Sequence, residues 1–150
     1  MHRLYRGDRM NHHCGAIARV RGVGGIQGTV IFQQTNCGVL VTADISGLPE
    51  SETDFFAFHI HEGGSCGGTD YADTGSHYNP GGADHPRHAG DLPPLLACRG
   101  RAYLQVRTER FRVEDVLGRT VVIHVSPDDF RTQPAGNAGK KIACGIICRF

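Results

Sequence analysis

The sequence predicts an all-β fold of antiparallel strands with two long functional loops. Short runs in which apolar and polar residues alternate recur along the chain, and 21 glycines among 150 residues supply tight turns. There is no tryptophan, and no stretch approaches the roughly 20 apolar residues of a membrane-spanning helix. We expect one domain over residues 14–150 and a poorly ordered tail over residues 1–13.

The strands are predicted from their alternation. In one example Val39, Val41, Ala43 and Ile45 alternate with Leu40, Thr42 and Asp44, as in a half-buried strand. Glycine and asparagine near residues 22–25 and 35–37 favour turns. A single helical turn is expected over residues 113–117. The strands are expected near residues 15–21, 27–34, 38–46, 55–61, 101–107, 119–125 and 142–149.

Six of the nine histidines lie in four short segments, which indicates a transition-metal site. His59 and His61 lie on one face of the strand predicted over 55–61, roughly 6.5–7 Å apart along the backbone. Their rings can therefore converge on one ion. His124, on the strand predicted over 119–125, is a plausible third ligand. Alone, each of these residues could equally be an ordinary surface or core histidine.

A segment over residues 62–94 lies between the strand that carries His59 and His61 and the strand that carries His124. A loop of this length in a compact chain is either functional or disordered. The segment is poor in large apolar residues, so it needs another means of being held. It contains His77, His85, His88 and Asp91, which suggest a tetrahedral zinc site. Asp91 alone could be a turn or helix-cap residue. Seven ligands for two four-coordinate sites imply that one imidazole serves both metals.

Five stretches together resemble the copper/zinc superoxide dismutase family. They occur in the family's order, and the resemblance covers about residues 16–148. The stretches are FHIHEGGSC (58–66), SHYNP (76–80), HAGDLPPL (88–95), GRTVVIHVSPDDF (118–130) and GNAGKKIACGII (136–147).

The resemblance implies a Greek-key β-sandwich or flattened eight-stranded barrel with two long functional loops, and a role for each matching residue. The expected copper ligands are His59, His61, His77 and His124; the expected zinc ligands are His77, His85, His88 and Asp91, with His77 as the bridging imidazolate. Asp128 matches the carboxylate that bonds one ligand of each metal. Arg119 matches the arginine that braces the long loop, and Cys66 and Cys144 match the family's disulfide.

The resemblance also implies an activity, the disproportionation of superoxide to dioxygen and hydrogen peroxide at copper, beside a structural zinc. His77 would deliver a proton, and a homodimer is possible. The alternative is a copper- and zinc-binding protein that stores or delivers metal without turnover. A superoxide-consumption assay on copper-loaded protein separates the two.

The sequence departs from the family pattern in three places. Lys141 stands where the family has an active-site arginine, which keeps the charge but loses the planar fork. Only two residues separate His85 from His88, fewer than in many relatives. The loop over residues 125–140 lacks a run of charged residues, so Arg131, Lys140 and Lys141 remain to attract an anion.

Composition excludes several classes of partner and compartment. The formal net charge is +1 and there is no basic stripe or tail, which argues against nucleic acid, and no membrane association is expected. No apolar run follows the N-terminal arginines, so no secretory signal is predicted and a cytoplasmic location is expected. The alternative is a processed chain or one that starts at Met10. Cys14, Cys37, Cys98 and Cys148 are expected to be free thiols, although a pair between Cys37 and Cys98 stays open.

Overall fold

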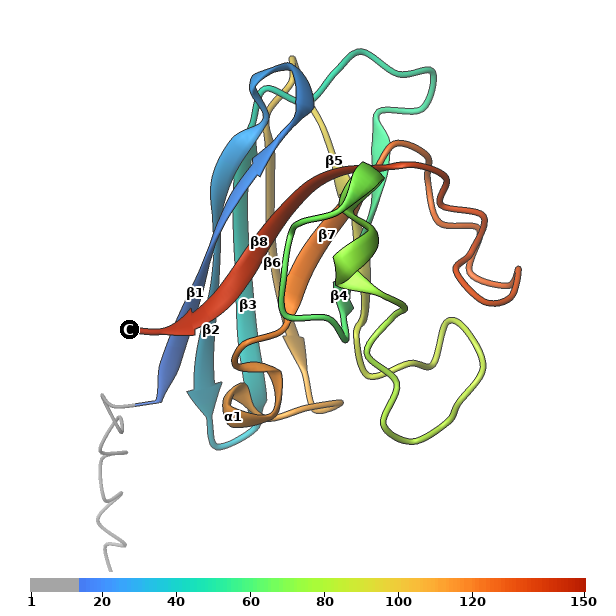
Figure 1. Cartoon of the computed structure of the whole chain (residues 1–150). Helices are drawn as coiled ribbons and strands as arrows, with labels where there is room; N and C mark the ends of the chain where they lie inside the picture. The colour runs from blue at the N-terminus through green and yellow to red at the C-terminus, as the bar shows by residue number, and fades with distance from the viewer. Residues whose placement is uncertain (1–13) are drawn as a thin grey trace, which may run out of the picture.

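In the computed structural model the chain forms one eight-stranded antiparallel sheet that curls into a nearly closed barrel (Figure 1). The structure describes residues 14–150, so the tail expected over residues 1–13 lies outside it. The strands are β1 (Gly15–Gly22), β2 (Gln27–Thr35), β3 (Gly38–Ser46), β4 (Phe55–His61), β5 (Asp91–Leu96), β6 (Ala102–Thr108), β7 (Thr120–His124) and β8 (Lys141–Arg149).

The strand order across the sheet is β5-β4-β7-β8-β1-β2-β3-β6. Strands β1, β2 and β3 form a meander, and the chain then crosses the barrel twice, from β3 to β4 and from β6 to β7. These crossings give the Greek-key connections that the resemblance implied. The two edge strands, β5 and β6, approach each other and nearly complete the barrel.

Strand β5 is the one strand that the alternation pattern missed, because its residues were assigned to the long loop. Leu92 and Leu95 face the core, whereas Pro93 and Pro94 interrupt the pattern in between. Proline lacks a backbone N–H donor and is tolerated in a strand at the edge of a sheet. Strand β5 is such an edge strand, and β4 is the only described strand that pairs with it. The other seven strands lie where predicted.

Strand β4 shows how alternation separates the core from the site. Phe56, Phe58 and Ile60 point into the barrel and are 0% exposed. His59 and His61 point to the outer face, where the long loops bury them. The hydrophobic effect of the inner face therefore holds the histidines in register on a rigid strand. Other large core side chains are Phe32, Ile45, Leu95, Ile123 and Ile147.

The two long loops, residues 62–90 and 125–140, lie on the same side of the barrel, outside β4 and β7 (Figure 1). Arg119 braces the first loop, because its guanidinium donates to the Glu62 carbonyl oxygen at 3.1 Å and lies 4.1 Å from the centre of the Tyr78 ring. The short helices are η1 (Val23–Gly25), η2 (Thr69–Thr74) and α1 (Val113–Val116), the last being the expected helical turn.

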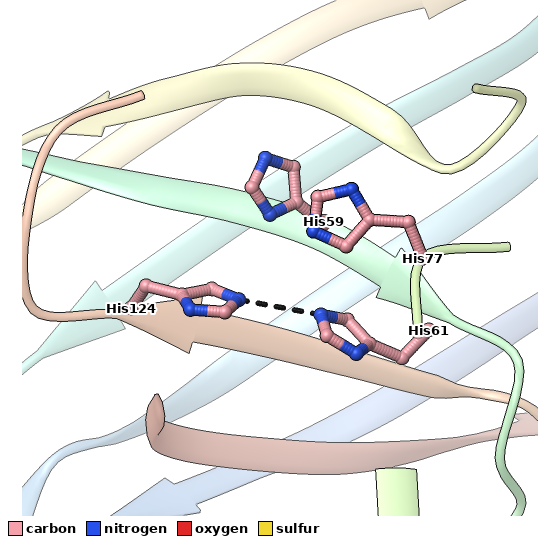
Figure 2. Close-up of side chains that lie close together, drawn as sticks. All are labelled: His59, His61, His77 and His124. Atoms are coloured by element: carbon pink, nitrogen blue, oxygen red, sulfur yellow. Dashed lines mark hydrogen bonds between the residues drawn. The ribbon is translucent and has the colours of Figure 1, made fainter. Parts of the chain in front are cut away.

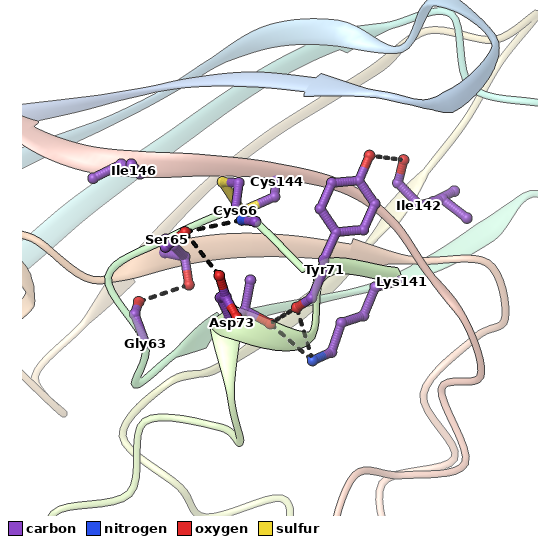
Figure 3. Close-up of a disulfide and its surroundings, with 12 residues drawn as sticks. Gly63, Ser65, Cys66, Tyr71, Asp73, Lys141, Ile142, Cys144 and Ile146 are labelled. Atoms are coloured by element: carbon purple, nitrogen blue, oxygen red, sulfur yellow. Dashed lines mark hydrogen bonds between the residues drawn. A yellow bond between two sulfur atoms is a disulfide. The ribbon is translucent and has the colours of Figure 1, made fainter. Parts of the chain in front are cut away.

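A disulfide between Cys66 and Cys144 ties the first loop to β8, as expected, with 5.8 Å between the Cα atoms (Figure 3). The four remaining described cysteines are free, so the open Cys37–Cys98 pair does not form. Within residues 14–150, no helix is long and apolar enough to cross a membrane.

Candidate metal centre

Four histidines converge on the outer face of the barrel, where β4 and β7 lie side by side (Figure 2). His59 and His61 come from β4, and His124 ends β7. His77 comes from the first loop, where its backbone forms an isolated antiparallel bridge with His61. One ring nitrogen from each of the four lies within 4.8 Å of the others, close enough to hold a single metal ion.

Backbone carbonyls set the orientation of two of these rings. The Nδ1 atom of His61 donates to the Gly75 carbonyl oxygen at 2.8 Å, and Nδ1 of His124 donates to that of Gly139 at 3.0 Å. Because a carbonyl can only accept, each neutral ring keeps its proton on Nδ1 and presents a lone pair at Nε2. The two Nε2 atoms are 3.2 Å apart and face each other, an arrangement that a cation between them would stabilise.

The other two rings of this group leave buried nitrogens without a partner. His59 uses its Nε2 atom for the Asp128 carboxylate, 2.7 Å away, and its Nδ1 atom is buried with no hydrogen-bond partner in the described part of the chain. Nε2 of His77 is buried and unpartnered in the same way. A buried polar atom with no partner is costly, so these atoms fit a site that an ion completes.

A second group adjoins the first and consists of His77, His85, His88 and Asp91. The Asp91 carboxylate lies 2.8 Å from Nδ1 of His77 and 3.0 Å from Nδ1 of His85. The latter contact lacks hydrogen-bond geometry, and Nδ1 of His85 is another buried atom with no hydrogen-bond partner in the described chain. Three imidazoles and one carboxylate are a donor set that suits tetrahedral zinc.

Asp128 connects the two groups. Its Oδ2 atom accepts from His59, and its Oδ1 atom lies 2.8 Å from Nε2 of His85. A carboxylate that bonds one ring of each group fixes the tautomer and the angle of both rings. Gly136, with φ +68°, packs against this contact, and a Cβ atom there would collide with Asp128 and His85.

Burial favours the neutral form of His59, His61 and His124, and a histidine must be neutral to bind a metal. Burial lowers the pKa of His61 to about 2 and that of His124 to about 4, although carbonyl hydrogen bonds partly oppose it. Burial also lowers the pKa of His59. Burial alone would raise the pKa of Asp128, but hydrogen bonds from His59, His85 and the Phe130 amide outweigh it, so this pKa is lowered and the carboxylate is ionised.

A hollow of about 510 Å³ opens above the first group, and Lys141 lines it together with His61, His77 and His124. The Lys141 ammonium group donates to the Thr74 hydroxyl oxygen at 2.8 Å and to the Gly75 carbonyl oxygen at 3.1 Å (Figure 3 shows Lys141 beside this loop). Both acceptors are uncharged. Lys141 therefore forms no ion pair with a carboxylate of the described chain, although Glu62 lines the same hollow; desolvation lowers the pKa of the Lys141 ammonium group.

Lys140, the other lysine expected to attract an anion, is placed differently. Its ammonium nitrogen lies 3.3 Å from a carboxylate oxygen of Asp70, and both side chains are largely exposed. An exposed ion pair of this kind offsets much of the local charge. Lys141 is therefore better placed than Lys140 to attract an anion into the hollow.

The structure brings together all seven ligands that the sequence predicted, with Asp128 between the two groups. It also reveals contributors that the sequence analysis missed. The Gly75 and Gly139 carbonyls that orient two rings are backbone groups with no signal in the side-chain sequence. The side chains of Gln133 and Arg110, which contact the backbone around His85 and His88, were also missed.

A Greek-key barrel that carries two adjoining groups of imidazole and carboxylate ligands defines a metal-binding β-barrel protein. The family described as "Copper/zinc superoxide dismutase" matches residues 26–147 of the chain, which is most of its length. The chain belongs to the copper/zinc superoxide dismutase family. The family's metals are copper and zinc, and the two donor sets fit them.

Individual relatives agree with this membership. "Superoxide dismutase [Cu-Zn] 2" of Aquifex aeolicus is 37% identical over 139 residues, covering 83% of this chain and 80% of the Aquifex protein. The Legionella pneumophila "Superoxide dismutase [Cu-Zn]" is 35% identical and covers 80% of this chain and 76% of its own length. The mouse "Copper chaperone for superoxide dismutase" is 36% identical over 89% of this chain, which spans 53% of the chaperone.

Proposed function

We propose that the protein catalyses the disproportionation of superoxide, in which two superoxide anions and two protons yield one dioxygen and one hydrogen peroxide. The observation that carries this proposal is the position of His77, which belongs to both ligand groups. Its Nδ1 atom faces Asp91 at 2.8 Å, and its buried Nε2 atom is the nitrogen left for the first group. A site that only stores two metals needs no shared ring.

The two groups would hold different ions. The first, four imidazoles, suits copper, and the second, with its carboxylate, suits zinc. Copper, when bound, supplies the one-electron oxidation and reduction that the reaction requires. We infer that His77 would serve both ions as the bridging imidazolate, because its Nε2 atom is available to the first group and its Nδ1 atom belongs to the second. The copper ligands would be His59, His61, His77 and His124, and the zinc ligands His77, His85, His88 and Asp91.

The chain's own residues would contribute charge, order and a proton. Lys141 would attract the superoxide anion into the hollow, because its ammonium group bonds uncharged acceptors and forms no ion pair within the described chain, although Glu62 also lines the hollow. His77 would hold at Nε2 one of the protons that the peroxide requires, in the part of the cycle in which this nitrogen does not serve as a ligand. Asp128 keeps His59 and His85 in place while the substrate turns over.

The alternative is a protein that binds copper and zinc in order to store or deliver them. It draws support from the similarity to the copper chaperones for superoxide dismutase of mouse, rat and human. The chain spans 53% of each chaperone's length, whereas it spans 80% of the Aquifex dismutase. That coverage, together with the shared ring, favours the enzyme.

Superoxide consumption by the copper- and zinc-loaded chain decides between the two functions. The enzyme requires catalytic turnover that disappears in a His61→Ala, His124→Ala double variant, because both changes remove ligands of the first group. A loaded protein that binds both metals stoichiometrically, yet consumes superoxide no faster than the double variant, would establish the storage alternative.

A further inference from the structure

The second ligand group depends on a short segment of irregular backbone, residues 85–91, that carries three of its four ligands. His85, His88 and Asp91 lie within seven residues, and only the last belongs to a strand. Such a segment would sample many conformations unless other parts of the chain held its backbone. Two side chains from outside the segment hold it in place.

Gln133, in the loop over residues 125–140, holds the first ligand through a reciprocal pair of hydrogen bonds. The His85 backbone N–H donates to Oε1 of Gln133 at 2.8 Å, and Nε2 of Gln133 donates to the His85 carbonyl oxygen at 2.8 Å. The same loop supplies Asp128, which bonds the His85 ring. One loop therefore holds both the backbone and the ring of a residue that is 3% exposed.

Arg110, which follows β6, holds the rest of the segment from another direction. One terminal nitrogen of its guanidinium donates to the Pro86 carbonyl oxygen at 2.8 Å and to the His88 carbonyl oxygen at 3.2 Å, and it lies 3.5 Å from that of Asp91. A guanidinium is always charged and offers only donors, so it suits a convergence of backbone carbonyls. These three carbonyls span the segment between its first and last ligands.

We propose that Gln133 and Arg110 are positioning residues for zinc, which hold the backbone of residues 85–91 so that its ligands converge before the metal binds. The inference rests on the proposed assignment of zinc to the second group. It explains how the group is ordered with only two residues between His85 and His88. Groups that orient metal ligands typically change metal affinity by about 10- to 100-fold when removed.

The test uses the full chain and two variants that keep side-chain size but lose hydrogen bonding, Gln133→Leu and Arg110→Met. Zinc affinity is measured by competition with a chromophoric chelator, and Co²⁺ placed in the same site reports its geometry through visible absorption. We expect about tenfold weaker zinc binding in each variant, weaker tetrahedral cobalt absorption, and copper affinity within twofold of the unsubstituted chain. Arg110→Lys, which keeps a donor, should recover part of the loss.

Arg112→Met and Gln105→Leu are matched controls, because Arg112 pairs with Glu114 and Gln105 bonds Thr42, away from the segment. Both should bind zinc like the unsubstituted chain. Unchanged zinc affinity in Gln133→Leu and Arg110→Met would overturn the inference alone. An equal loss of copper and zinc affinity, with a lower melting temperature of the metal-free variants, would also overturn it by showing a general structural role. An unsubstituted chain that binds neither zinc nor cobalt would instead overturn the proposed function, and this inference with it.

Discussion

The Lys141 ammonium nitrogen lies 2.8 Å from the Thr74 hydroxyl oxygen. This hydrogen bond connects Lys141 to the first long loop, which also carries Cys66. A second acceptor, the Gly75 carbonyl oxygen, is shared with Nδ1 of His61. The residue that would attract the substrate is thus joined through one carbonyl to a proposed copper ligand. Substitution of Lys141 can separate the effect of its charge from the effect of its contact with the loop.

Lys141→Ala should lower superoxide turnover at low ionic strength, and Lys141→Arg should raise it, because arginine restores a planar fork over the hollow. Stopped-flow rates at increasing salt measure the effect, which should shrink as the charge is screened. Lys140→Ala is the control, since Lys140 pairs with Asp70. Equal rates for the unsubstituted chain, Lys141→Ala and Lys141→Arg would show that Lys141 does not guide the substrate.

Asp128→Asn should weaken the binding of both metals by about 10- to 100-fold, because an amide cannot accept from His59 and His85 with both of its polar atoms. Equilibrium dialysis against chelators of graded strength measures both affinities. Asp44→Asn, on the exposed face of β3, serves as the control. Loss of one metal alone would contradict the position of Asp128 between the two groups.

Cys66→Ser should lower the free energy of unfolding by about 2–5 kcal/mol and loosen metal retention, because the disulfide closes a loop of 78 residues. Thermal unfolding under oxidising conditions measures the loss, and Cys148→Ser, which removes a free exposed thiol, is the matched control. A melting temperature equal to that of the unsubstituted chain would argue against a stabilising role for this bond.

The metal-free protein should become less stable as the pH falls from about 6.5 towards about 4. Burial lowers the pKa of His124 from 6.5 to about 4 and that of His61 to about 2. Over this window the unfolded chain binds protons that the folded chain does not. The free energy of unfolding therefore falls by about 1.4 kcal/mol per pH unit for each ring, once the pH is well below 6.5.

Urea unfolding of the metal-free chain across this pH range measures that slope. A His61→Asn, His124→Asn double variant lacks both rings and should show a shallower decline. A free energy of unfolding that stays constant or rises as the pH falls would contradict the burial of neutral histidines.

The sequence predicted which seven side chains the structure brings together, partly through alternation and spacing and partly through the family resemblance. His59 and His61 share a face as soon as β4 is a strand, and the core residues Phe56, Phe58 and Ile60 determine which face. Strand β5 was missed because two prolines interrupt its alternation, and only its position at the sheet edge permits them.

The sequence also could not predict which side chains bond to backbone groups far away along the chain. Gln133 and Arg110 bond carbonyl and amide groups that every residue carries, so no residue pattern marks their partners. Their roles depend on how two loops and the end of β6 meet in space. Likewise the Gly75 and Gly139 carbonyls orient His61 and His124 only through the folded course of the loops.

The most direct test of the proposed His77 bridge is the electron-spin signal of Cu²⁺ in the full chain, measured with zinc and then with paramagnetic Co²⁺ in the second group. One ring bonded to both ions would couple their unpaired electrons, so the copper signal should be strong with zinc and largely lost with cobalt. His77→Ala should restore it. A copper signal that stays the same with either partner ion would contradict a His77 ring shared by the two metals.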